Sequence, residues 1–178
     1  SLCGFEQVLP SAMGRLFEEE YCVVSELMER PKRPCVFVLG GAKIADAFIM
    51  MDTVFKNGTA DKVVAGGVCG QIILAARGEE IGSQTMAFIK KSNNEQFIPV
   101  AKTLLEKYAD KLVLPVDLAY VKDGVRCECD LGAVPSDINA LDIGHKTIEL
   151  FKNEIMNAAT VFSNGPMGVF EEEPTEDG

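Results

Sequence analysis

Val36-Phe37-Val38-Leu39-Gly40-Gly41-Ala42-Lys43 is the stretch of this 178-residue sequence that says most about its fold. Its apolar run stops at two glycines, and a lysine follows within three positions. This order is typical of a buried strand, a tight turn and the start of a helix. Glycines in such a turn let a ligand approach the backbone, and the free amides of a helix N-terminus attract an anion. The stretch therefore predicts a strand–turn–helix unit suited to an anionic ligand.

Short apolar runs alternate with helical patterns along most of the chain. We expect strands at residues 35–40, 62–65, 112–116 and 160–162, and helices at 42–55, 69–77, 95–109 and 145–157. A hairpin is expected at 119–129, because Asp123-Gly124 is a strong turn signal. The alternation predicts an α/β fold class, with a doubly wound, mostly parallel sheet and flanking helices in a Rossmann-like lobe.

Other glycine-containing segments lie where the expected strands end. Gly66-Gly67 and Asn164-Gly165-Pro166-Met167-Gly168-Val169-Phe170-Glu171 each follow an apolar run, and Asp142-Ile143-Gly144 stands before a helix. Ligands of open α/β sheets bind at the carboxyl ends of the strands. These segments therefore suggest two walls of one nucleotide or phosphate cleft.

A separate helix is expected at residues 11–30, before the first strand. Ser11 is a favourable N-cap, apolar residues recur at helical spacing, and Pro31 ends the pattern. This helix either connects two lobes or packs on the sheet. We divide the chain into a connecting segment at 1–34 and a globular lobe at 35–178.

Composition limits the choice of partners. Hydrophobic residues make up 47% of the sequence, enough for a real core, and the net charge is −10. This charge argues against nucleic acid or an anionic membrane as a partner. It does not exclude a nucleotide, because a few oriented amides and one lysine set the local field. The longest apolar runs are too short to span a bilayer and no secretory signal is present, so we expect a cytoplasmic protein.

The cysteines and the single histidine suggest little chemistry of their own. The six cysteines are scattered, and we expect them to be reduced. Cys127 and Cys129 share a strand face, but no second pair and no nearby histidine completes a tetrahedral metal site. No metal ligand is therefore predicted in this chain. His145 is either a residue that caps or flanks its helix, which we favour, or a catalytic base.

The absent motifs narrow the reaction class. The sequence contains no G-x-x-x-x-G-K-[ST], G-x-G-x-x-G or G-x-S-x-G, which leaves phosphoryl transfer by positioning and charge stabilisation. Lys43 is the predicted catalytic residue, with Asp46 orienting it through a charged pair. The alternative is a surface lysine at a helix start. Such a lysine opposes the helix dipole, and an anionic ligand explains its placement beside glycines better.

These segments resemble the signatures of the phosphoglycerate kinase family, specifically its archaeal-type branch. Gly40-Gly41-Ala42-Lys43-Ile44-Ala45-Asp46 and residues 164–171 match two of them. Leu114-Pro115-Val116-Asp117 and Asp142-Ile143-Gly144 fall between the two in the family's order. The opening Leu9-Pro10-Ser11-Ala12-Met13-Gly14-Arg15 resembles the run into the helix that joins the family's two lobes. The resemblance covers essentially the whole chain.

The resemblance implies glycolytic and gluconeogenic phosphoryl transfer between 1,3-bisphosphoglycerate and ADP, giving 3-phosphoglycerate and ATP, with Mg²⁺. It implies a nucleotide site made of Gly41, Ala42 and Lys43 at the phosphate end, Gly66 and Gly67 beside the adenine, Ala140 and Leu141 as an apolar wall, Asn164, Pro166, Gly168 and Val169 on the opposite side, and Glu171 at the ribose hydroxyls. The expected partners are ATP or ADP, and 3-phosphoglycerate through a lobe outside this chain.

The sequence also departs from the family. Many members carry a second lysine four residues after the first, and this position is Ala47 here. The substrate-binding lobe would precede Ser1, and the segment whose aspartate holds the metal nucleotide would follow Gly178. We therefore expect a truncated chain, monomeric or homodimeric, that holds most of the nucleotide site. The alternative function is a non-catalytic nucleotide-binding or interaction fragment.

Overall fold

The structure is a computed structural model that describes residues 10–171 and 173–175. Leu9, the first residue of the run that resembles the interlobe connection, lies outside the described residues. The chain divides into two compact units, residues 1–31 and 32–178. No helix among the described residues is long and apolar enough to cross a membrane.

The first unit contains helix α1 (Arg15–Glu29), which begins four residues later than predicted. Its N-cap is Gly14 and not Ser11: Gly14 is extended, and its carbonyl accepts the amide of Glu18 at 2.9 Å. The carboxylate of Glu18 lies in the first turn, where it complements the helix dipole. Glycine is unfavourable inside a helix, so the helix begins after Gly14 and is shorter than predicted.

The second unit is built on a parallel sheet, which confirms the predicted fold class. Its strands are β1 (Cys35–Leu39), β2 (Lys62–Ala65), β3 (Leu112–Val113) and β7 (Thr160–Asn164), in the order β3-β2-β1-β7. All five residues of the central strand β1 are buried, as its unbroken apolar sequence requires when helices cover both faces. Strand β3 is shorter than predicted, since Pro115 cannot donate to the ladder.

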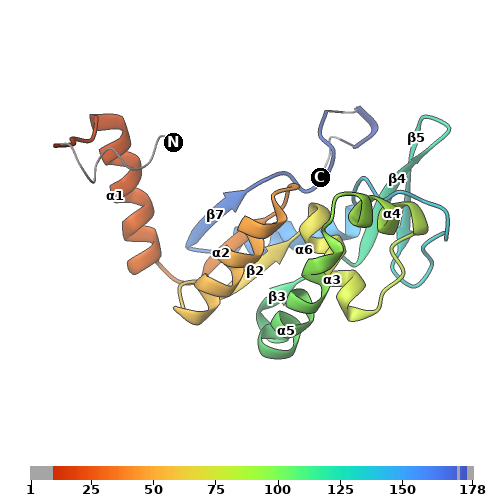
Figure 1. The fold of residues 1–178 in the computed structure, drawn as a ribbon, viewed down its shortest axis with the longest axis horizontal. Coiled ribbons are helices and arrows are strands. Elements are labelled where there is room, and N and C mark those ends of the chain that lie inside the picture. Colours follow the sequence, from red (N-terminus) through yellow and green to blue (C-terminus); the bar gives the residue numbers. More distant parts are fainter. Residues whose placement is uncertain (1–9, 172, 176–178) are drawn as a thin grey trace. The chain divides into compact units, whose positions relative to one another are not determined.

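Helices cover both faces of this sheet (Figure 1). The structure contains α2 (Ile44–Lys56), α3 (Gly67–Arg77), α4 (Ser83–Lys91), α5 (Ile98–Tyr108) and α6 (His145–Met156), with short 3₁₀ turns η2 (Glu95–Phe97), η3 (Ala109–Lys111) and η4 (Glu173–Thr175). Helix α6 packs Phe151 against Val36 and Val38 of β1. Helices α2, α3 and α5 lie on the opposite face (Figure 1), so the unit has three layers.

Helix α4 was not predicted from the sequence. It is only nine residues long, and of these only Thr85 and Ile89 are buried. Its N-cap is Gly82, which carries no capping side chain. A short helix without a capping side chain gives little sequence signal.

The second unit also contains an antiparallel sheet of three strands. It contains β4 (Asp117–Lys122), β5 (Val125–Asp130) and β6 (Asp142–Ile143), in the order β5-β4-β6. The predicted hairpin is present, and Asp123 and Gly124 both have positive φ in its turn. Asp142-Ile143, which was placed at the edge of the parallel sheet, instead pairs with β4.

Candidate functional site

Three glycine-rich turns meet at the carboxyl edge of the parallel sheet. Leu39 stands opposite Ala65 of β2 and Asn164 of β7, so the three strands end side by side. Backbone hydrogen bonds then join the turns: the Gly41 amide donates to the Pro166 carbonyl at 2.7 Å, and the Gly67 amide donates to the Met167 carbonyl at 2.9 Å.

These turns approach too closely for side chains. A Cβ atom on Gly40 would lie 2.2 Å from the Pro166 oxygen, and one on Gly67 would lie 2.9 Å from the Gly41 nitrogen. Gly41, Gly67 and Gly165 also have positive φ. Glycine is therefore required here both by space and by backbone conformation.

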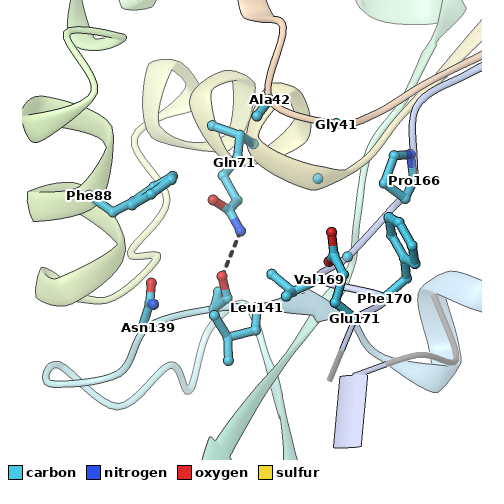
Figure 2. Close-up of a pocket in the computed structure, with 14 residues that line it drawn as sticks. Gly41, Ala42, Gln71, Phe88, Asn139, Leu141, Pro166, Val169, Phe170 and Glu171 are labelled. Carbon is cyan, nitrogen blue, oxygen red and sulfur yellow. Dashed lines mark hydrogen bonds between the residues drawn. The ribbon is translucent and has the colours of Figure 1, made fainter. Parts of the chain in front are cut away.

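The turns border a pocket of about 260 Å³ (Figure 2). It is lined by Gly41, Ala42, Gly67, Val68, Gln71, Phe88, Asn139, Ala140, Leu141, Pro166, Gly168, Val169, Phe170 and Glu171. Every residue predicted for the nucleotide site is in this set except Lys43, Gly66 and Asn164. Segments far apart in the sequence are thus brought around one cavity.

The three remaining residues lie outside the pocket lining. Gly66 caps α3 and donates its amide to Leu39. Asn164 ends β7, and its carbonyl accepts the Gly40 amide at 2.9 Å. Lys43 is exposed at the N-cap of α2, and the described residues provide it with no ion pair, including the predicted one with Asp46. Its side chain is therefore not held by a carboxylate.

Sequence reasoning missed five lining residues: Val68, Gln71, Phe88, Asn139 and Phe170. Phe88 belongs to α4, the helix that the sequence did not reveal. Gln71 did carry a signal, because it is a polar residue inside the otherwise apolar first turns of α3. Among the lining residues, all of which are described, Glu171 is the only charged one.

A charged cluster behind the pocket holds its outer wall. The Arg126 guanidinium donates to the Asp142 carboxylate at 2.9 Å and to the Pro174 carbonyl at 3.3 Å. Burial opposes the charged guanidinium, but the hydrogen bonds that it donates to Asp142 and Glu128 outweigh this effect and raise the pKa of Arg126. The Val169 amide donates to the Leu141 carbonyl at 2.9 Å, so the wall is tied to the adjoining strand β6.

His145 lies at the start of α6, outside the pocket lining. Its ring is paired with the carboxylate of Glu128, and its amide donates to the same carboxylate at 3.1 Å. This is the placement expected of a residue that flanks its helix.

The last feature of the site to consider is whether the described side chains include a cluster of metal ligands. Within 10–171 and 173–175, no group of three or more His, Cys, Asp or Glu side chains could hold a metal ion. Cys127 and Cys129 lie on β5, and burial raises the pKa of the Cys129 thiol, which disfavours the thiolate that a metal needs.

Taken together, the parallel sheet and the pocket define a doubly wound α/β protein whose cavity lies at the carboxyl edge of the sheet, where such folds bind their ligands. The family model described as Phosphoglycerate kinase matches residues 1–178. The chain belongs to the phosphoglycerate kinase family, and the resemblance found in the sequence is confirmed.

Known members of the family are similar to this chain over nearly its whole length. The phosphoglycerate kinase of the archaeon Methanothermus fervidus is 39% identical over 173 residues, which are 97% of this chain and 42% of the relative. That of Enterococcus faecalis is 40% identical over 167 residues, 92% of this chain and 40% of the relative. The crystal structure of phosphoglycerate kinase from Pyrococcus horikoshii superimposes with a TM-score of 0.89 at 32% identity, covering 97% of this chain and 44% of that one. The chain thus spans less than half the length of these relatives.

Proposed function

We propose that this chain binds ADP or ATP in the glycine-lined pocket and provides the nucleotide part of phosphoryl transfer between 1,3-bisphosphoglycerate and ADP. One observation carries the proposal: residues from the family's separate signatures line a single cavity at the carboxyl edge of the sheet. That edge is where open α/β sheets bind their ligands.

The pocket suits the parts of a nucleotide. Ala42, Leu141 and Val169 offer apolar surface on which a purine could pack. The Glu171 carboxylate is an acceptor for the two ribose hydroxyls. We place the phosphates at the turn that begins α2, where the free amides of the first turn attract anions and Lys43 adds a mobile cation. Lys43 would then stabilise the charge on the transferred phosphoryl group.

The remaining parts of the proposal come from the family. Magnesium would arrive with the nucleotide, because Mg²⁺ keeps several waters and is commonly bound through one or two carboxylates and the substrate phosphates. The phosphoglycerate would be bound by a lobe outside this chain, with residues 1–34 as the connection to it and 35–178 as the nucleotide-binding lobe. Family membership also supports a cytoplasmic, glycolytic role.

A second candidate function is nucleotide binding without transfer. The pocket lining, which consists of described residues, contains no basic side chain, and Lys43 stands outside it. Phosphoryl transfer needs cations to stabilise the charge of its transition state. A pocket that binds the base and ribose without such cations would hold a nucleotide and leave it unchanged.

Calorimetric titration of the 178-residue chain with ADP, with and without Mg²⁺, tests the proposal. We expect binding that Lys43→Ala weakens about tenfold, the size of one lost charge-assisted hydrogen bond. Lys102→Ala, which removes an exposed lysine of α5 outside the pocket, is the matched control and should not change the affinity. No ADP binding by a folded chain would overturn the proposed function.

Transfer is tested separately from binding. The chain is mixed with the two parts of an archaeal relative that we expect to precede and to follow it, and ATP formation from 1,3-bisphosphoglycerate and ADP is followed. ATP formation that Lys43→Ala abolishes supports the kinase function. ADP binding without ATP formation favours the second candidate.

A further inference from the structure

Gln71 is a buried amide in a pocket whose walls are largely apolar. Its residue surface is only 7% exposed, yet it lines the cavity near Phe88 and Leu141. Its Nε2 donates to the Ala140 carbonyl at 2.9 Å (Figure 2). A polar side chain in this setting must find partners for all its polar atoms.

The chemistry of this hydrogen bond determines which way the amide points. A carbonyl oxygen only accepts, so the nitrogen of Gln71 must face Ala140 and the oxygen must face away from it. Figure 2 shows this oxygen turned toward the Phe88 side of the pocket. No described residue donates to it.

This unpaired oxygen is open to the cavity. Among the described residues, no fully buried side-chain nitrogen or oxygen lacks a partner, so the Gln71 oxygen must reach accessible space. The accessible space beside Gln71 is the pocket that it lines. The pocket therefore contains an acceptor that a ligand or a water molecule has to satisfy.

The acceptor is held rigidly. Ala140, to which Gln71 donates, is itself anchored, because its amide donates to Thr85 Oγ1 at 2.8 Å. Gln71, Thr85 and Ala140 are all buried, so their packing leaves the amide little freedom to turn. A preorganised acceptor selects a ligand by the position of the ligand's donor.

We propose that Gln71 Oε1 accepts a hydrogen bond from the 6-amino group of adenine and so selects adenine nucleotides over 6-oxopurine nucleotides. This inference rests on the proposed function, in which the pocket binds a nucleotide. An inosine or guanosine base presents an acceptor oxygen at position 6. Two acceptors then face each other and the Gln71 oxygen loses its partner, which is the arrangement that rejects an analogue most strongly.

A purely structural role for Gln71 makes a different prediction. If the side chain serves only to hold Ala140, its loss shifts the wall of the pocket and weakens every purine nucleotide alike. If it also recognises the base, its loss changes the ratio of the affinities. The ratio of ADP to IDP affinity is therefore the informative quantity.

The experiment is calorimetric titration of the wild-type chain and of Gln71→Met with ADP and with IDP. Methionine keeps the length and apolar stem of glutamine and has no strong hydrogen-bonding group. We expect wild type to bind ADP about tenfold more tightly than IDP, and Gln71→Met to reduce this preference to about one. Gln96→Met, which makes the same substitution at an exposed glutamine outside the pocket whose Nε2 also donates to a backbone carbonyl, is the matched control and should leave the preference at its wild-type value.

A measurement on wild type alone covers the case in which the variants do not fold. ADP is compared with the purine riboside diphosphate that lacks only the 6-amino group, and we expect about a tenfold loss. Equal affinities for ADP, IDP and this analogue would overturn the inference and leave the proposed function standing. No binding of any nucleotide would overturn the proposed function and the inference with it. An unchanged ADP preference in a folded Gln71→Met would likewise refute the role of Gln71.

Discussion

Asp142 lies directly behind Gly168: a Cβ atom on Gly168 would be 2.1 Å from Asp142 Oδ1. The Asp142 side chain is completely buried and is held from the other side by Arg126, so it cannot withdraw. The two residues come from different parts of the fold, β6 and the loop after β7. The carboxylate thus sets the position of the loop that forms one wall of the pocket.

Gly168→Ala is expected to displace this wall. The added methyl group must push the loop outward, because its nearest neighbour is a rigid carboxylate and not the end of a flexible side chain. Overpacking of this kind costs about 1–3 kcal/mol, and we expect ADP affinity to fall at least about tenfold with it. Calorimetric titration measures the affinity, and thermal unfolding reports the stability.

Gly132→Ala is the matched control for this change. Nothing lies within 4 Å of the Cβ position of Gly132, which is exposed and outside the pocket. It should leave both affinity and unfolding temperature close to wild type. Normal ADP affinity in Gly168→Ala would show that the loop does not depend on this contact.

The ion pair between Arg126 and Asp142 is expected to matter for stability. Its side chains are 14% and 0% exposed, respectively. Replacing Arg126 by Met leaves a buried carboxylate without its cation, which should lower the free energy of unfolding by about 3 kcal/mol. Urea denaturation measures this difference.

Arg77→Met provides the comparison for Arg126→Met. Arg77 pairs with Glu79, and these side chains are 42% and 33% exposed, so we expect a loss below about 1 kcal/mol. If the two variants are destabilised equally, burial does not govern the strength of these pairs.

The Glu128 carboxylate is expected to make stability depend on pH. Burial favours its neutral form, but hydrogen bonds from His145 and Arg126 prevail and lower its pKa below the ordinary 4.5. A carboxyl group with a depressed pKa in the folded state stabilises the fold above its unfolded pKa. That contribution is lost as the pH falls through the folded pKa.

Glu128→Gln should therefore be less stable than wild type near neutral pH, and the gap should close in acid. We expect a difference of about 1 kcal/mol at pH 7, as for a partly exposed charged hydrogen bond. Urea denaturation at a series of pH values measures it. Glu106→Gln, on the exposed side of α5, should show no such trend. A Glu128→Gln deficit that grows toward acid pH would contradict this account of the carboxylate.

Much of the parallel lobe could be predicted from neighbouring residues. The apolar run 35–39 and the glycines after it indicated both the central strand and the turn, because burial and positive φ are properties of individual positions. The Asp123-Gly124 turn was found for the same reason. Helix α4 was missed because it is short and its N-cap glycine has no capping side chain. The pairing of Asp142-Ile143 with β4 was missed because strand pairing is not written in local sequence.

Asp117 shows where such reasoning ends. Helix α6 has Gly144 at its N-cap, and a glycine has no side chain to cap with. The Asp117 carboxylate accepts the amides of Lys146 and Thr147 at 2.9 Å each. Asp117 is buried and lies about thirty residues before the helix that it caps. In the sequence it is only the last residue of Leu114-Pro115-Val116-Asp117, and nothing there indicates a cap.

The sequence by itself determined the strand–turn–helix units, the glycines at their junctions and the family, since each rests on the order of adjacent residues. Only the tertiary structure decided that Gln71 would face Ala140, that Asp142 would support Gly168, and that Lys43 would stand outside the pocket lining. Those relationships join residues distant in the chain. They form when burial of apolar surface closes the sheet and its helices together, and buried polar groups must then find partners wherever the packing has brought them.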